Sequence, residues 1–374
     1  MGLTSKKVLL LAVVVAVLLF ALTVWLWPRL ARRSLPAVLG RVGVLLGTEL
    51  SLLAAGGLAA NLYFGFYSSW ADLFGADQDM GVVVEHGDGT KTARQLQLRG
   101  TQKVGVQGGG HSPRTAGHIH KVQINGAITG IAAPAYVYLP PQYFQPEYAG
   151  RKFPAALVLT GFPGTAENLI SRMQYPRTAA RRIEAGTMRP TVLVMMRPTV
   201  APPRDTECVD VPGGPQAETF FTKDLRKAIT SHYRVGRQAR SWGVIGNSTG
   251  GYCALKMTMR HPGAFSAGAG LSATYEAPQD RATGDLFGGS KRLEQENNLM
   301  WRLDNRPMPP VSLLLASSRR GESNYKDTRD FIARAQPPLK VSSMILDSGG
   351  HNFNTWNREV PPALEWLANH LSAP

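Results

Sequence analysis

The sequence predicts an α/β fold, a three-layer sandwich with a mostly parallel central sheet, preceded by transmembrane helices at the N-terminus. Two observations carry this prediction. After residue 154, short and wholly apolar runs alternate with helix-like stretches, which is typical of strands buried on both faces of a parallel sheet. Near the N-terminus, residues 8–27 form an uncharged run of 20 residues, the length that an α-helix needs to cross about 30 Å of hydrocarbon.

The composition is that of a globular protein. Of the 374 residues, 44% are hydrophobic and 18% are charged, which excludes a disordered or collagen-like chain. Lys and Arg total 41 against 26 Asp and Glu, but no RNA-recognition signature or zinc-finger spacing accompanies this excess. We therefore expect no nucleic-acid partner. The basic surface is typical of a solvated face, or of one that attracts anionic lipid or envelope polymer.

The first apolar run, 8–27, is predicted to be a membrane span rather than a cleaved signal peptide. The apolar part of a signal peptide is about 7 to 15 residues long and is followed by small residues at the cleavage site. Here the run ends in Trp25-Leu26-Trp27-Pro28, which is typical of an aromatic anchor at the membrane interface.

A second apolar stretch, 42–62, is predicted to span the membrane as well. It contains Gly43 and Gly47 at the spacing that lets two membrane helices approach closely. The alternative is a helix that lies in the interface, because Glu49 and Asn61 are costly in lipid unless they find partners.

The distribution of positive charge predicts the orientation. The loop between the two apolar stretches carries four arginines, against Lys6 and Lys7 before the first stretch, which favours a cytoplasmic loop. We therefore expect a multi-pass protein of the cell membrane with its large C-terminal domain outside the cytoplasm. If only the first run spans, the arginines favour the opposite side for that domain.

The rest of the chain divides by composition. We assign 1–67 to a membrane anchor, 68–117 to a connector rich in Gly, Asp, Gln and Thr that holds one strand, and 118–374 to a single α/β domain. That domain opens with an antiparallel pair of strands, 118–124 and 135–139. His118 and His120 share a strand face, but no acid or cysteine lies near them in the sequence, so we predict no metal site.

The parallel part of the sheet is predicted from buried apolar runs and the helical stretches between them. The strands are 155–160, 191–196, 242–245, 311–316 and 341–346, and the helices are 166–184, 219–233, 249–260, 324–335 and 359–371.

The strongest chemical signal is Gly246-Asn247-Ser248-Thr249-Gly250-Gly251, between a buried strand and a helix. A nucleophile on a strand-to-helix turn needs small neighbours because the backbone bends tightly there. The N-terminus of the following helix stabilises negative charge that develops nearby. Ser248 is therefore the candidate nucleophile.

A serine hydroxyl needs a base, and the base needs an acid to orient it. His351 follows the strand 341–346, where the base is expected, and other histidines after Ser248 lie at helix ends or in the terminal helix. Glu322 follows the strand 311–316 closely and is the candidate acid. Asp327 is the alternative acid, five residues further on, while Asp347 precedes His351 too closely to face it.

An oxyanion hole takes one backbone N–H from the residue after the nucleophile and another from the loop after an earlier strand. The first donor is predicted to be Thr249. The second comes from Gly161-Phe162-Pro163-Gly164, where Phe162 is the better candidate because Pro163 has no N–H.

At this point the sequence resembles the putative esterase family of α/β-hydrolases, which contains esterase D and the cell-envelope mycolyltransferases. The resemblance covers about residues 118–374 and rests on four ordered segments: Val137-Tyr138-Leu139-Pro140-Pro141, Gly161-Phe162-Pro163-Gly164, Gly246-Asn247-Ser248-Thr249-Gly250-Gly251, and Gly349-Gly350-His351-Asn352 with Trp356. It implies an α/β-hydrolase fold that acts on carboxylic esters through an acyl-enzyme. Asn247 and Thr249 differ from the commoner residues beside the nucleophile, which leaves the acyl preference open.

The chain has two cysteines. Cys208 follows the strand 191–196, and Cys253 lies five residues beyond Ser248 on the predicted helix. An extracytoplasmic location allows them to form a disulfide, and two free thiols are the alternative. Neither cysteine has the surroundings of a nucleophile.

The sequence thus predicts a membrane-tethered serine esterase that hydrolyses carboxylic esters through an acyl-serine intermediate, without a metal or an organic cofactor. Its expected partners are the ester substrate, the lipid bilayer around the N-terminal helices, and a cell-envelope glycolipid or polymer. Two alternatives stay open. One is an acyltransferase, similar to the mycolyltransferases, that acts on envelope sugar or lipid hydroxyls. The other is a non-catalytic envelope module on a hydrolase scaffold.

Overall fold

The computed structural model describes residues 5–32, 34–64, 95–104, 112–202 and 204–374. The chain forms two compact units, Met1–Gln78 and Asp79–Pro374, and each is described by itself. Most of the predicted connector 68–117 lies outside the described residues.

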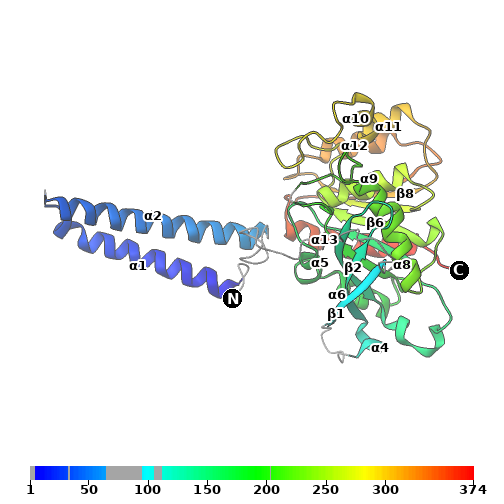
Figure 1. Cartoon of the computed structure of the whole chain (residues 1–374), viewed down its shortest axis with the longest axis horizontal. Coiled ribbons are helices and arrows are strands. Elements are labelled where there is room, and N and C mark those ends of the chain that lie inside the picture. Colours follow the sequence, from blue (N-terminus) through cyan, green and yellow to red (C-terminus); the bar gives the residue numbers. More distant parts are fainter. Residues whose placement is uncertain (1–4, 33, 65–94, 105–111, 203) are drawn as a thin grey trace, which may run out of the picture. The chain divides into compact units, whose positions relative to one another are not determined.

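The N-terminal unit is a pair of helices, α1 (Lys6–Leu30) and α2 (Leu35–Phe64), which lie side by side (Figure 1). By length and composition both are apolar enough to cross a membrane, with mean hydropathies of 3.0 and 1.7. A hydrogen bond of 2.8 Å between the hydroxyls of Thr23 and Thr48 joins them. A Cβ atom on Gly43 or Gly47 would meet no other atom within 4 Å. The two glycines therefore do not form the close contact that their spacing predicts.

The second unit contains one nine-stranded sheet within the described residues, in the order β1-β2-β3-β5-β4-β6-β7-β8-β9. The strands from β1 to β5 in this order pair antiparallel, and those from β5 to β9 pair parallel. Their bounds are β1 (Leu96–Lys103), β2 (His118–Asn125), β3 (Ala132–Leu139), β4 (Ala155–Leu159), β5 (Val192–Met196), β6 (Trp242–Asn247), β7 (Ala267–Leu271), β8 (Ser312–Ser318) and β9 (Lys340–Leu346).

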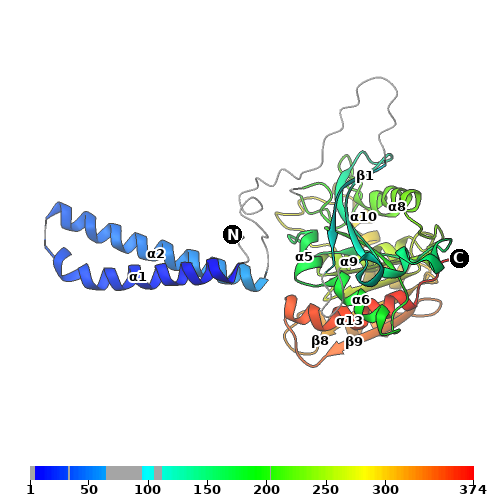
Figure 2. The same ribbon diagram turned by 90° about the horizontal axis from the view of Figure 1, so that it is seen from below.

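Helices cover both faces of the parallel strands. One layer contains α8 (Arg226–His232), α9 (Thr249–Arg260) and α12 (Tyr325–Arg334), and the other contains α6 (Tyr175–Glu184) and α13 (Phe353–Asn369), which lie together in Figure 2. The other short helices of the described ranges are α4 (Pro113–Ala116), η1 (Pro141–Phe144), η2 (Pro146–Tyr148), α5 (Ala166–Ser171), α7 (Ala217–Thr219), η3 (Phe220–Leu225), η4 (Ala239–Ser241), α10 (Lys291–Asn297) and α11 (Leu299–Asn305).

The apolar runs form the core because alternate residues of a strand face opposite helical layers. Leu157 and Val244 belong to the core on the α9 side, whereas Val158 and Ile245 belong to the core on the α13 side. All four are fully buried, and each aliphatic side chain of this size contributes about 1.5 to 3 kcal/mol. The predicted α/β three-layer fold is confirmed.

Several elements differ from the sequence prediction, among them β7 and two of the predicted helices. β7 was not predicted, because Ala-Gly-Ala-Gly-Leu lacks the branched and aromatic residues typical of strands. Its glycines let α9 approach closely, since a Cβ on Gly268 would lie 2.5 Å from the hydroxyl of Thr258. The predicted helix 166–184 is divided before Gln174, which has a φ of 51°. The terminal helix begins at Phe353 rather than 359, because the Asn352 side chain caps it.

Candidate active site

Ser248 lies on a strained turn between β6 and α9. Its φ of 55° and ψ of −125° are rare for a residue with a side chain. The flanking glycines are required: a Cβ on Gly246 would lie 2.4 Å from the backbone of Gly250, and one on Gly250 would lie 2.4 Å from the carbonyl oxygen of Leu159. The turn therefore holds the serine at the carboxyl end of the sheet, as a nucleophile requires.

The structure brings His351 to this serine. The imidazole Nε2 lies 2.8 Å from the Ser248 hydroxyl oxygen, although 103 residues separate them in sequence. The ring packs edge-on against Trp356, with 5.2 Å between ring centroids. The side chain of His351 is open to solvent on one side. The protein groups packed around the rest of the ring bury it, and this burial lowers the pKa of His351. A lowered pKa keeps the ring neutral at pH 7 and able to accept the hydroxyl proton.

The loop of the candidate acid Glu322 packs against the loop of His351, since the N–H of Gly349 donates a hydrogen bond of 3.0 Å to the carbonyl oxygen of Arg320. Among the described residues, Glu322 makes no hydrogen bond to His351. One of its carboxylate oxygens accepts a hydrogen bond from the Ser272 hydroxyl, and the other accepts one of 2.9 Å from the backbone N–H of Ser318. Burial raises the pKa of Glu322, and these hydrogen bonds oppose that rise. Asp327 is exposed in the first turn of α12.

A chain of contacts nevertheless connects Glu322 to the base. The Ser272 hydroxyl that donates to Glu322 accepts a hydrogen bond of 2.9 Å from Nε1 of Trp356. Trp356 is the ring that packs against His351. Sequence analysis missed Ser272, because it follows β7, the strand that the sequence does not reveal. The signal that could have found it is its place immediately after a strand neighbouring the nucleophile's own.

Two backbone N–H groups lie beside the nucleophile. Thr249 is the first residue of α9, so its N–H has no partner within the helix, and the helix dipole adds positive potential there. The loop of Phe162 passes against the serine, since a Cβ on Gly161 would lie 2.9 Å from the Ser248 Cβ. Among the residues that the structure describes, neither the Phe162 nor the Thr249 N–H donates to a carbonyl.

A disulfide joins Cys208 to Cys253, with both residues fully buried. It fastens the loop after β5 to α9, one turn beyond the nucleophile. That loop also places Glu207 beside the Thr249 hydroxyl, a neighbour that sequence analysis did not single out. Within the described ranges, no group of three or more His, Cys, Asp or Glu side chains could hold a metal ion.

This chain is similar in sequence to a curated protein. It is 24% identical over 257 residues to an uncharacterised protein of Corynebacterium glutamicum, an alignment that covers 63% of this chain. The chain spans only 57% of the length of that relative.

Solved structures share the fold. An S-formylglutathione hydrolase from Agrobacterium tumefaciens aligns with a TM-score of 0.57 at 15% identity, covering 74% of this chain and 99% of that one. A ferulic acid esterase aligns with a TM-score of 0.57 at 19% identity, covering 68% and 97%. A fluorophosphonate-binding serine hydrolase of Staphylococcus aureus aligns with a TM-score of 0.53 at 15% identity, covering 67% and 98%.

The family comparison covers the strands from β3 to β9 and the helices among and after them. The model described as "Putative esterase" matches residues 127–369, which include the serine turn and the histidine loop. This chain therefore belongs to the putative esterase family of serine hydrolases.

Proposed function

We propose that this protein is a membrane-anchored serine esterase that cleaves carboxylic esters through an acyl-serine intermediate. The observation that carries the proposal is the hydrogen bond of 2.8 Å between Ser248 and His351 on a strained strand-to-helix turn. The two apolar helices, α1 and α2, would hold the enzyme in the bilayer, with the catalytic unit on the outer side.

In the first step, the Ser248 hydroxyl donates its proton to Nε2 of His351 while its oxygen attacks the ester carbonyl. The N–H groups of Phe162 and Thr249 hold the negative charge that develops on the carbonyl oxygen. The protonated His351 then gives its proton to the leaving alcohol, and an acyl-serine remains.

In the second step, His351 takes a proton from the water that attacks the acyl carbonyl, then gives that proton to the Ser248 oxygen as the bond to the acyl group breaks and the acid is released. Glu322 is the proposed acid that supports the imidazolium. Because the pKa of His351 is lowered, we expect the loss of kcat/KM on the acid side of the pH profile to begin below the pH at which an unperturbed histidine titrates.

The test is hydrolysis of p-nitrophenyl esters of short and long acyl chains by the full chain in detergent, beside its Ser248→Ala variant. We expect the variant to lose roughly 10³- to 10⁶-fold in kcat. A fluorophosphonate probe should label the wild type and not the variant. A folded wild type that neither cleaves any ester nor reacts with the probe would contradict the proposal and favour a non-catalytic scaffold.

Transfer of the acyl group to a sugar or lipid hydroxyl would use the same residues. The two reactions differ only in what attacks the acyl-serine. Adding a sugar acceptor to the assay distinguishes them, because transfer forms a new ester at the expense of the free acid.

A further inference from the structure

The loop after β5 turns back onto the first residue of the nucleophile helix. Glu207 in this loop is 2% exposed, and one of its carboxyl oxygens accepts a hydrogen bond of 3.3 Å from the Thr249 hydroxyl. The other oxygen, Oε2, is buried and has no hydrogen-bond partner among the described residues. Thr249 is the residue whose backbone N–H is proposed to hold the oxyanion, so Glu207 lies directly behind that donor.

The backbone that presents Glu207 is strained and firmly held. Glu207 and Cys208 have φ angles of 47° and 52°, in the left-handed region. The ammonium group of the fully buried Lys256 donates hydrogen bonds of 2.9 and 2.8 Å to their two carbonyl oxygens. The disulfide to Cys253 fixes the same loop to α9. Strain that is held this tightly is common at functional sites.

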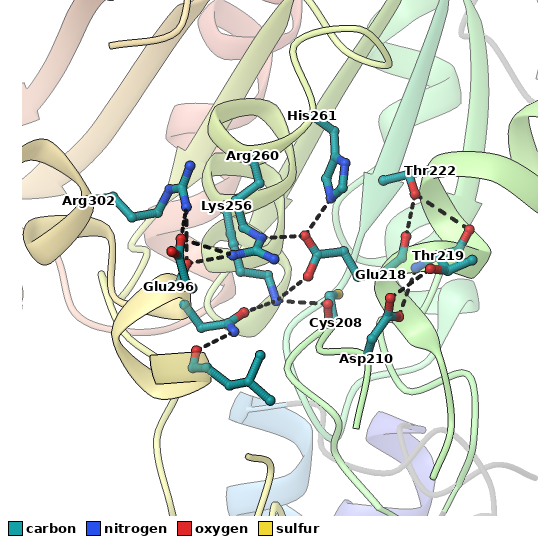
Figure 3. Close-up of polar contacts among 12 residues, drawn as sticks. Cys208, Asp210, Glu218, Thr219, Thr222, Lys256, Arg260, His261, Glu296 and Arg302 are labelled. Atoms are coloured by element: carbon teal, nitrogen blue, oxygen red, sulfur yellow. Dashed lines mark hydrogen bonds and ion pairs between the residues drawn. The ribbon is translucent and has the colours of Figure 1, made fainter. Parts of the chain in front are cut away.

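Lys256 is itself fixed by a network of buried charge (Figure 3). Its ammonium group donates to the side-chain oxygen of Asn297 and lies 3.7 Å from the carboxylate of Glu218. Glu218 also pairs with Arg260 and His261. Burial disfavours the charged form of Glu218, but these cations outweigh it and hold its pKa well below the usual value. Burial lowers the pKa of Lys256 to about 8, and the neighbouring carboxylate of Glu218 opposes that fall.

The charges that face Glu207 come from three elements. Asp205 lies on the same loop, Lys256 on α9, and Asp280 on the loop after β7. Burial and the carboxylate of Asp205 raise the pKa of Glu207 to about 8, against the opposing effects of Lys256 and Thr249. A neutral acid also suits the unpartnered Oε2, because an unpaired charge is far more costly to bury than an unpaired hydroxyl.

We propose that Glu207 is a positioning residue of the oxyanion hole, which holds Thr249 in place as a neutral acid and weakens the site when it ionises. This inference rests on the proposed esterase function. A neutral carboxyl accepts the threonine hydrogen bond and adds no charge behind the donor. An ionised carboxylate keeps the hydrogen bond but places a negative charge near the developing oxyanion.

The size of the effect follows from electrostatics. A unit negative charge that appears one hydrogen bond away from Thr249, in surroundings of effective dielectric constant about 20, slows the reaction roughly 10- to 50-fold. The sign is fixed by the raised pKa: Glu207 is neutral below about pH 8 and ionises above it. Activity should therefore fall as the pH rises through this range.

The experiment measures kcat/KM of the full chain in detergent from about pH 7 to about pH 9.5, corrected for spontaneous ester hydrolysis. The readout is the ratio of kcat/KM at about pH 7 to kcat/KM at about pH 9.5 within each variant. We expect the wild type to lose roughly 10- to 50-fold over this range and Glu207→Gln to lose less than about threefold, because an amide does not ionise and only the change at Lys256, whose pKa is lowered to about 8, remains. Asp205→Asn should move the fall to lower pH, since removing that charge eases the ionisation of Glu207.

Glu359→Gln is the matched control. Glu359 is a fully buried glutamate in α13. Its pKa is also raised to about 8, by burial and by the neighbouring charge of Glu322. The fall of kcat/KM with rising pH should persist in Glu359→Gln. A fall that persists in Glu207→Gln, or disappears in Glu359→Gln, overturns the proposal. A wild type without any activity that depends on Ser248 contradicts the esterase function instead, so the two failures are distinguishable.

Discussion

The two sides of Ser248 are built differently. On the α9 side, the loop of Glu207 is buried, strained, cross-linked through Cys208 and tied to Lys256. On the α13 side, His351 is reached by solvent and rests on Trp356, with Glu322 connected through the Ser272 hydroxyl. The side of the proposed oxyanion donor Thr249 is thus fixed by a covalent bond and buried charge, whereas the side of the proposed base His351 depends on a few hydrogen bonds.

This difference matches what each side must do. An oxyanion hole works by being in place before the charge develops, so a rigid scaffold favours it. A general base must accept a proton and then release it to a leaving group, and catalytic hydrogen bonds often shorten only once substrate is bound. We therefore expect substitutions on the base side to change kinetics, and those on the oxyanion side to change stability as well.

After Ser248→Ala, the largest effect on kcat is expected at Glu322. Glu322→Gln keeps the shape and removes the charge that supports the imidazolium, so kcat should fall roughly 10²- to 10⁴-fold with little change in KM. Asp327→Asn is the control, because Asp327 is exposed on α12 and should be silent. Steady-state kinetics of both variants test this prediction. A larger loss of kcat in Asp327→Asn than in Glu322→Gln would make Asp327 the catalytic acid.

The next effect concerns the disulfide between Cys208 and Cys253. The disulfide closes a loop with a sequence separation of 45, and restricting the unfolded chain in this way is worth about 4 kcal/mol. Replacing both Cys208 and Cys253 with alanine should lower the free energy of unfolding of the catalytic unit by up to that amount. A short pulse of protease at increasing urea concentration measures it.

Reductant provides the matching control for this prediction. Added to the wild type, it should produce a similar shift in the urea midpoint, whereas the double variant should not respond to it. An unchanged midpoint in the double variant would mean that Lys256 and the buried charges alone hold the loop.

The parts of the site that sequence analysis predicted are those set by local pattern. The serine turn follows from small residues between a buried strand and a helix, and the histidine loop follows from its place after the last strand. The contacts of Glu322 were not predictable, because they run through Ser272, which follows a strand of alanine and glycine. Glu207 escaped notice because 42 residues separate it from Thr249 and only the folded chain brings them together.

The two N-terminal helices, α1 and α2, show the same limit. Their length and hydropathy are readable in the sequence, but the face that each presents to the other is not. The spacing of Gly43 and Gly47 predicts the contact, yet the structure joins the helices through Thr23 and Thr48. Small residues permit a close approach without requiring it.

The smallest effect is expected at Trp356. Trp356→Phe keeps a ring against His351 and removes only the N–H that donates to Ser272. A hydrogen bond of this kind contributes about 1 kcal/mol, so kcat should fall roughly fivefold. Trp366→Phe is the matched control, because that indole donates to the Ser342 hydroxyl at a distance of 3.2 Å, on β9 and away from the base.

The double variant with Glu322→Gln tests whether Trp356 and Glu322 act through one chain of hydrogen bonds. If Ser272 transmits the effect of Trp356 to the carboxylate, the loss of the indole N–H should matter little once the charge is gone, and the double variant should resemble Glu322→Gln alone. If the two losses multiply instead, the indole N–H of Trp356 acts independently of the Glu322 charge. The base side would then rest on two independent supports rather than one.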